Sequence, residues 1–330
     1  MLLEFDADQQ LWQDTVRDAV AKQCPASLVR SIAEGGADAA QVWNTYVEQG
    51  WTELAEPETA VELAIVLEQL GRATDPTPYL ATVTQFAPLA GDRYQPGQAA
   101  TAIYSGITAH RDTDGWVLSG TARYVLDGDR AETFAVVTDG GTFVVDAAQA
   151  RVTRTEVFDP LLHVADVALP GVRLTQDDRL HTDGERAHHI ALMGISITTV
   201  GACQRALDLV LAHVRDRHQF GVPIGSFQAV QHKAVDMHVA IERARALAYF
   251  SALTISADDP RRRLAAAMAK AAAGECQSVV FRHGLQLFGG MGFTWENDVQ
   301  FALKRAKVGE LMLGGAAEHR AIIADEYRGF

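Results

Sequence analysis

A forked positive charge, an amide and an aromatic ring stand together in one short segment of this chain. The segment runs from Arg217 to Gln228 and reads Arg-His-Gln-Phe-Gly-Val-Pro-Ile-Gly-Ser-Phe-Gln. Arg217 offers a planar, permanently charged group that can hold a phosphate through two hydrogen bonds. Gln219 adds amide donors, and Phe220 supplies a ring that can pack on a ligand. These residue types suit a phosphate-bearing ligand.

A second segment, Gln-Leu-Phe-Gly-Gly-Met-Gly-Phe from Gln286 to Phe293, pairs an amide with a run of glycines. Gln286 can hydrogen-bond the edge of a base or a ribose. Gly289 and Gly290 let backbone N–H groups approach a phosphate, because no Cβ stands in the way. Each feature alone has a simpler explanation: an arginine at a helix end usually faces solvent, and a Gly-Gly pair usually ends a helix.

The elements that must position these segments fall into three regions. The first is predicted to be helical and the second to consist of short strands. Residues 1–95 favour helices, including one over Val61–Leu70 that Gly71 should end. Residues 96–175 favour short strands, with one over Val164–Leu169 that Pro170-Gly171 should close. Strands with turn residues and no helices between them predict a small antiparallel barrel or sandwich.

Residues 176–330 return to a helical pattern, and the predicted helices are long. They cover Ala187–Arg217, Gln228–Ile255, a stretch ending near Phe288, and Asp298–Tyr327 with a possible break at Gly314-Gly315. Long helices joined by short links make a four-helix bundle. The sequence therefore predicts an N-terminal helical domain, a middle antiparallel β domain and a C-terminal helical bundle.

Composition excludes several classes of function. The 330 residues carry a net charge of −13, so we expect no binding to nucleic acid or to an anionic membrane. We find no secretory signal and no stretch apolar for long enough to span a bilayer. The three cysteines are far apart and the histidines lack metal-ligand spacing, so we expect no metal and a reducing, cytoplasmic location.

The two segments at 217–228 and 286–293 resemble the paired signatures of the acyl-CoA dehydrogenases, in the family's order and spacing. Ala269-Lys270 and Trp116 to Gly120 also fit that family, whereas residues before 95 match it weakly and are short for it. Two long motifs at family spacing favour cofactor contact over the simpler explanations.

The resemblance implies an acyl-CoA dehydrogenase fold and FAD as the cofactor, bound across a subunit interface. It also implies that both segments serve the FAD of a neighbouring subunit, contacting its pyrophosphate and adenine. The FAD-contacting residues that it indicates are Arg217, Gln219, Phe220, Gln286, Gly289 and Gly290.

The chemistry of the family needs a carboxylate that removes the α-proton of the acyl-CoA while flavin accepts a hydride from the β-carbon. By resemblance, the usual position of that glutamate falls on Leu313, and the alternative position falls on Ala191. Neither residue can accept a proton. The flavin-facing threonine of the family aligns with Leu126, which has no hydroxyl, and the family's Thr-Glu-Pro loop is missing.

Other residues could in principle replace the base. Glu310 lies one helical turn before Leu313, and Glu318 lies further along the same segment. Both are more typical of surface carboxylates. The pair His188-His189 lies near the alternative position, but adjacent helical residues face two directions.

The chain keeps the segments that contact a neighbour's FAD but lacks the base and the flavin-facing threonine. In this combination it resembles the non-catalytic subunit of actinobacterial heterotetrameric (α2β2) steroid acyl-CoA dehydrogenases. The resemblance implies a catalytic partner subunit that holds most of the acyl-CoA substrate, and an electron-transferring flavoprotein as electron acceptor. Two alternatives stay open: a homomeric acyl-CoA oxidoreductase with an unorthodox base such as Glu310, and a non-enzymatic scaffold subunit.

Overall fold

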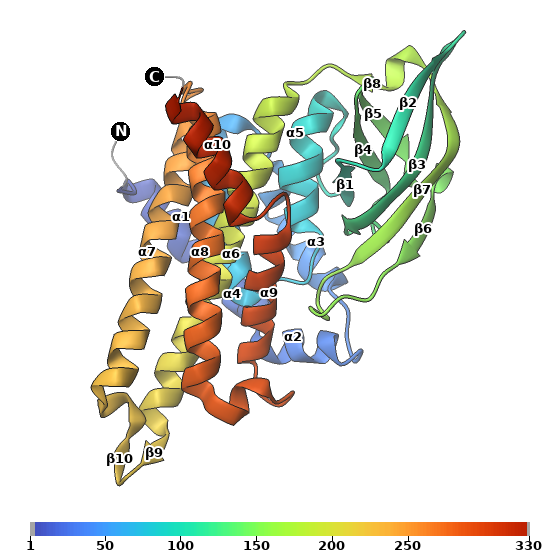
Figure 1. The fold of residues 1–330 in the computed structure, drawn as a ribbon. Helices are drawn as coiled ribbons and strands as arrows, with labels where there is room; N and C mark the ends of the chain where they lie inside the picture. Colours follow the sequence, from blue (N-terminus) through green and yellow to red (C-terminus); the bar gives the residue numbers. More distant parts are fainter. Residues whose placement is uncertain (1–3, 329–330) are drawn as a thin grey trace. The chain divides into compact units, whose positions relative to one another are not determined.

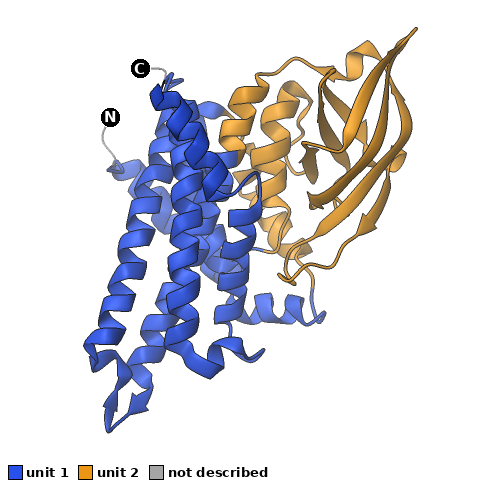
Figure 2. Cartoon of the chain, viewed as in Figure 1, with its two compact units in different colours: residues 1–37, 57–75, 192–330 blue, residues 38–56, 76–191 orange. Residues whose placement is uncertain are grey.

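A computed structural model describes residues 4–328, which form two compact units (Figures 1 and 2). Unit 1 comprises residues 1–37, 57–75 and 192–330, and unit 2 comprises residues 38–56 and 76–191. Each unit therefore combines stretches from both the N-terminal and the later parts of the chain. The three domains expected at 1–95, 96–175 and 176–330 stay a prediction.

Unit 1 is built around long helices that lie side by side in Figure 1. Its helices include α1 (Ala7–Gln23), α2 (Ala26–Ala33), α4 (Ala60–Ala73), most of α6 (Gly184–Asp216), α7 (Gln228–Ser256), α8 (Arg262–Phe288), α9 (Val299–Leu311) and α10 (Ala316–Arg328). The lengths of α6, α7 and α8 agree with the sequence prediction, and α9 ends close to the predicted break. A two-stranded hairpin, β9 (His218–Gln219) with β10 (Val222–Pro223), joins α6 to α7.

Two glycines let α4 and α6 approach each other closely. A Cβ on Gly71 would lie 2.2 Å from the carbonyl oxygen of Thr198, and one on Gly201 would lie 2.1 Å from that of Glu68. The prediction that Gly71 ends its helix is wrong, because α4 continues to Ala73. Gly71 serves helix packing, which its neighbours in sequence do not reveal.

A buried polar network ties α4 to α7. The Glu68 carboxylate accepts hydrogen bonds from Arg245 Nε and from the Tyr249 hydroxyl, both at 2.8 Å. The side chain of Glu68 is 4% exposed, so its charge depends on these donors in place of water. Burial and the Glu68 charge raise the pKa of Tyr249, which keeps the phenol protonated as a donor.

Unit 2 holds two four-stranded sheets that enclose an apolar core (Figure 1). One sheet has the order β1-β4-β5-β8 and the other the order β2-β3-β7-β6. The strands are β1 (Ala100–Ile103), β2 (Ile107–Asp112), β3 (Gly115–Leu126), β4 (Thr133–Thr138), β5 (Gly141–Asp146), β6 (Arg151–Arg154), β7 (Val164–Leu174) and β8 (Arg179–Leu180). The sheets are antiparallel except that β1 pairs with β4 in parallel. The helices α3 (Ala40–Glu48) and α5 (Ala87–Ala90) also belong to this unit.

Strand β7 continues past the expected stop at Pro170-Gly171. Leu118 pairs with Val172 and Ser119 pairs with Pro170, so Gly171 is an extra residue in the ladder. Its φ of 88° suits glycine, and the result is a β-bulge rather than a strand end.

Helix α6 corrects the expectation that no segment is apolar enough to span a bilayer. By length and composition alone, Gly184–Asp216 could do so. However, 89% of its most apolar window is buried inside the protein, so that surface is covered by protein side chains. Core helices of water-soluble proteins pass the same composition test.

Candidate functional site

The Arg217 segment forms an exposed hairpin at one end of the unit 1 helices (Figure 1). Its tip is Phe220-Gly221, with φ of 54° and 83°, and the Phe220 ring is 93% exposed. A left-handed conformation costs a non-glycine residue about 1 kcal/mol. The Phe220 ring meets Phe227 edge-on, with centroids 6.2 Å apart, but most of its surface is uncovered. An exposed aromatic residue with a strained backbone suits a contact outside the chain.

The Gln286 segment lies at the same end of unit 1 as that hairpin. The ring of His213, near the end of α6, stacks on Phe288 at the end of α8, with centroids 4.5 Å apart. Burial and the positive charge of Arg217 lower the pKa of His213, so its ring is neutral at pH 7 and suited to stacking. The end of α6, which leads into the first segment, therefore packs on the second segment.

The side chains of Arg217 and Gln286 are available to a ligand. The Gln219 amide instead donates to the carbonyl of His218 at 2.8 Å, and the Gly289 N–H caps α8 by donating to the Gln286 carbonyl. Arg217, Gln219, Gln286, Gly289 and Gly290 are exposed. The side chains of Arg217 and Gln286 have no hydrogen bond or ion pair among residues 4–328.

Open space surrounds the glycine pair of the second segment. A Cβ built on either Gly289 or Gly290 would meet nothing within 4 Å, and Gly289 has a φ of 61°. Glycine is therefore not required there by packing against this chain. The Arg217 guanidinium suits the diphosphate of FAD, and the Gln286 amide suits its adenosine.

Leu313, where the resemblance predicts the base, lies at the junction of α9 and α10. Leu313 adopts a φ of 51° there, followed by Gly314 at 90°. Two buried side chains hold the junction. Lys270 Nζ donates to the carbonyl oxygens of Glu310 (3.0 Å) and Gly314 (2.6 Å), and His319 Nε2 lies 2.9 Å from that of Leu313.

Electrostatics at this junction follow from burial. Burial lowers the pKa of Lys270 to about 8, although Glu310 and Glu318 oppose the shift. Burial also lowers the pKa of His319, so at pH 7 the ring is neutral and its Nε2–H donates to the Leu313 carbonyl. Both groups point their hydrogens at backbone oxygens, and Leu313 itself offers no proton acceptor.

Glu310 differs from the surface carboxylate that its sequence suggests. Its side chain is only 17% exposed, and its carboxylate forms an ion pair with Lys307 at 2.7 Å. Glu318 is exposed, and its carboxylate lies 3.4 Å from the backbone N–H of Gly315. The candidate replacement base is therefore already engaged by a cation on its own helix.

The other expected positions lie in unit 2. Ala191 is fully buried on α6, and Leu126 is 6% exposed at the end of β3. His188 packs edge-on against Tyr104, whereas His189 is 4% exposed and lies 4.0 Å from the Glu185 carboxylate. Within residues 4–328 no group of three or more His, Cys, Asp or Glu could hold a metal ion.

Sequence reasoning missed Lys270 and His319 as residues that shape the base position. In the sequence, Lys270 is marked only by the Ala269-Lys270 pattern that it shares with the family. A signal was present, since it is a single charge within the alanine-rich run 265–273 of a helix that must pack closely. The sequence contains no signal for His319. Its partner is the backbone carbonyl of Leu313, and every residue type has a backbone carbonyl.

Comparison with known proteins gives one consistent result. A family model described as the C-terminal domain of acyl-CoA dehydrogenase matches residues 189–327. The chain is 33% identical over 324 residues to "Acyl-CoA dehydrogenase IpdE2" of Mycolicibacterium smegmatis, covering 94% of this chain and 96% of that protein. The IpdE2 of Mycobacterium tuberculosis is 30% identical over 308 residues, with 91% of each chain covered.

Solved structures agree on the fold. A chain of the ChsE4-ChsE5 complex from Mycobacterium tuberculosis superposes with a TM-score of 0.89 at 23% identity, covering 100% of both chains. A chain of the Tcur3481-Tcur3483 steroid ACAD (acyl-CoA dehydrogenase) G363A variant gives 0.81 at 24% identity, covering 96% of this chain and 97% of that one. The predicted fold class is confirmed, FAD is the cofactor of this fold family, and the chain belongs to the acyl-CoA dehydrogenase family.

Proposed function

We propose that this chain is the non-catalytic subunit of a hetero-oligomeric, FAD-dependent acyl-CoA dehydrogenase. One observation carries the proposal. The segments at Arg217 and Gln286 present free, exposed donors, whereas Leu313 and Ala191 stand where the family has its base. A scaffold without ligand would have no use for those donors, and a self-sufficient enzyme would need a base.

In the proposed assembly, this chain contributes half of an interfacial FAD site. Arg217 would pair with the diphosphate of a partner's FAD through its forked donors. Gln286 would hydrogen-bond the adenosine, and the open space at Gly289 and Gly290 would let the phosphates come close to the backbone. FAD supplies hydride acceptance when bound, and the partner subunit supplies the base and most of the acyl-CoA site.

The proposed assembly and substrate are supported by the names of similar solved structures. The names of the similar solved structures include a two-component complex and a steroid ACAD, which supports an α2β2 heteromer acting on a bulky, steroid-derived acyl-CoA. An electron-transferring flavoprotein is the acceptor that we expect, and the cytoplasm is the expected location.

A homomeric enzyme that uses Glu310 is the second candidate. Its support is the largely buried carboxylate of Glu310 one turn before Leu313. Against it, Lys307 Nζ already donates to that carboxylate at 2.7 Å, so the side chain is engaged within its own helix.

The test is a flavin spectrum and a sizing run on the chain alone, then on the chain co-expressed with a candidate catalytic subunit. We expect a colourless chain alone and a yellow complex with about two FAD per four subunits, as a half-site in each chain requires. A chain that alone binds one FAD and oxidises an acyl-CoA would overturn the proposal. In that case Glu310→Gln should abolish the activity, with Glu318→Gln as the matched control.

A further inference from the structure

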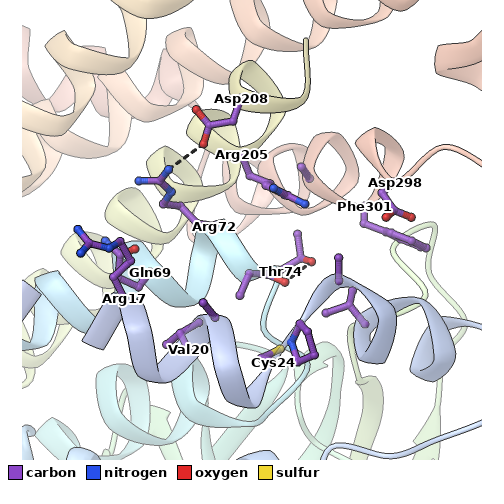
Figure 3. A pocket seen from close by; sticks show the side chains of 16 residues that line it. Arg17, Val20, Cys24, Gln69, Arg72, Thr74, Arg205, Asp208, Asp298 and Phe301 are labelled. Atoms are coloured by element: carbon purple, nitrogen blue, oxygen red, sulfur yellow. Dashed lines mark hydrogen bonds and ion pairs between the residues drawn. The ribbon is translucent and has the colours of Figure 1, made fainter. Parts of the chain in front are cut away.

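Unit 1 contains a cavity of about 330 Å³ that none of the proposed FAD-contacting residues lines (Figure 3). Helices α1, α2, α4, α6 and α9 form its wall, and every lining residue belongs to unit 1. The volume lies at the small end of the range for ligand pockets. Leu313 and the side chains that hold it are also absent from the lining.

The charged residues of this cavity are paired, with one exception. Arg72 forms an ion pair with Asp208 at 2.7 Å, and Arg17 forms one with Asp14 at 2.7 Å. Asp298 is taken by Arg30. Each carboxylate that lines the cavity therefore has a cation of its own.

Arg205 is the exception. Its side chain comes from α6 and is half-buried, and it has no hydrogen bond or ion pair with any residue in the described range 4–328. Figure 3 shows the guanidinium extending among the lining side chains on the same side of the cavity as Arg72. An arginine that is partly removed from water and unpaired attracts one negative charge from outside the chain.

The rest of the wall is largely apolar. Val20, Val29, Phe301 and Ala302 contribute hydrocarbon, and the thiol of Cys24 stays protonated because burial raises its pKa. One unpaired cation beside an apolar wall fits a ligand with one negative charge and an apolar body. A phosphate dianion would bring a second charge close to Asp208 and Asp298, which no free cation would offset.

We propose that this cavity binds a small carboxylic acid, with its carboxylate on Arg205 and its apolar body against Val29 and Phe301. Planar carboxylates match the forked donors of guanidinium. The proposal does not depend on the chain's role in FAD binding, because it uses no residue of that site.

The test uses benzoate as the probe, with benzamide as its neutral analogue and inorganic phosphate as the alternative anion. Binding to the full chain, and to its complex with the catalytic subunit, is followed by ligand-observed NMR titration at low ionic strength. We expect benzoate to bind clearly more tightly than benzamide or phosphate. Equal binding of benzoate and benzamide, tighter binding of phosphate, or no binding of benzoate would each overturn the proposal.

Variants locate the site. Arg205→Gln should weaken benzoate binding at least about tenfold, since a hydrogen-bonded charge pair contributes roughly that much. Arg215→Gln, an exposed arginine on the same helix, should leave it unchanged. Ala21→Phe, at the exposed rim, should block binding while all the charges remain.

Two further outcomes would count against the site. If Arg205→Gln leaves benzoate affinity intact, the carboxylate is not on Arg205 and the proposal fails; if Ala21→Phe has no effect, benzoate binds outside this cavity and the proposal fails too. If benzoate binds the chain alone but not the complex, a partner side chain fills the cavity and a free acid is not its ligand.

Discussion

Lys270 Nζ lies 2.6 Å from the carbonyl oxygen of Gly314, so a buried amine holds the backbone directly after Leu313, the position that the sequence resemblance indicates for the base. The amine also donates to the carbonyl of Glu310, at the end of the preceding helix. These bonds secure a junction in which Leu313 has a left-handed conformation. The hydrogen bonds of Lys270 therefore fix the backbone on both sides of Leu313, where the resemblance predicts the base.

The buried amine predicts a pH dependence of stability. The pKa of Lys270 is lowered to about 8 by burial, whereas a lysine in an unfolded chain titrates near 10.4. Between these values the unfolded chain binds more protons, so Lys270 should raise the free energy of unfolding as pH rises from 8 to 10.4. The rise is at most about 3 kcal/mol.

Urea unfolding of wild type and Lys270→Met at pH 7.5, 9 and 10 measures this contribution. The difference between the two proteins should grow with pH in favour of wild type. Lys22→Met, which removes an exposed lysine, is the control and should give a constant difference. A flat difference for Lys270→Met would show that the amine is not desolvated.

Breaking the buried pair of Glu68 and Arg245 should destabilise the chain strongly. Arg245→Ala leaves a carboxylate that is 4% exposed without its cation, which costs about 3–5 kcal/mol. Arg243→Ala breaks the ion pair between Arg243 and Glu275. The Arg243 side chain is 62% exposed, so this change should cost less than about 1 kcal/mol. Chemical denaturation of both variants checks the contrast, and equal losses would contradict it.

Gly201→Ala should destabilise unit 1 although alanine is the better helix former. Helix propensity favours alanine by about 1 kcal/mol. The new Cβ would meet the Glu68 carbonyl at 2.1 Å, and backbone cannot move aside as a side chain can. We expect a net loss of about 2 kcal/mol or more from such overpacking.

The control for this variant is Gly184→Ala, because a Cβ there would meet nothing within 4 Å. Thermal unfolding midpoints of the two variants give the comparison. Should Gly201→Ala prove as stable as wild type, the close packing of α4 and α6 is incorrect.

Replacing Arg217 should weaken FAD binding by the heteromeric complex. Arg217→Gln removes a charged, forked donor from the proposed diphosphate contact, and we expect a loss of about tenfold or more in FAD affinity. The fold should survive, because Arg217 is exposed and its side chain has no partner within residues 4–328. Flavin fluorescence during dilution of the complex measures the affinity, and Arg328→Gln, an exposed arginine on α10, is the control.

Phe220→Gly should separate assembly from folding. Phe220 is 93% exposed and has a φ of 54°, so glycine removes little more than the edge contact with Phe227 and relieves strain. We expect the chain alone to unfold at an unchanged or slightly higher temperature, while the dissociation constant of the complex rises at least about tenfold, as for an aromatic anchor. Leu11→Ala, which truncates a side chain 67% exposed on α1, should change neither. Sedimentation velocity would show an error if Phe220→Gly assembles like wild type.

Features that depend on local pattern could be predicted from the sequence. The bounds of α6, α7 and α8 follow from a hydrophobic period that is written within each helix. The β4–β5 hairpin follows from the turn residues Asp139-Gly140-Gly141 between two short apolar runs. The sequence also predicts the loss of the base, since neither Leu313 nor Ala191, the positions that the resemblance indicates, carries a proton acceptor.

Other features depend on residues far apart in the chain, and only the tertiary structure decided them. Gly71 continues its helix because Thr198 packs against it, and Lys270 is held by carbonyls about 40 residues later. Arg205 becomes a candidate anion-binding residue only when five helices pack together and form the cavity that it lines. The sequence by itself determined which chemical groups the chain possesses and where its helices run, while burial and pairing set what those groups can do, because both arise only when distant segments pack.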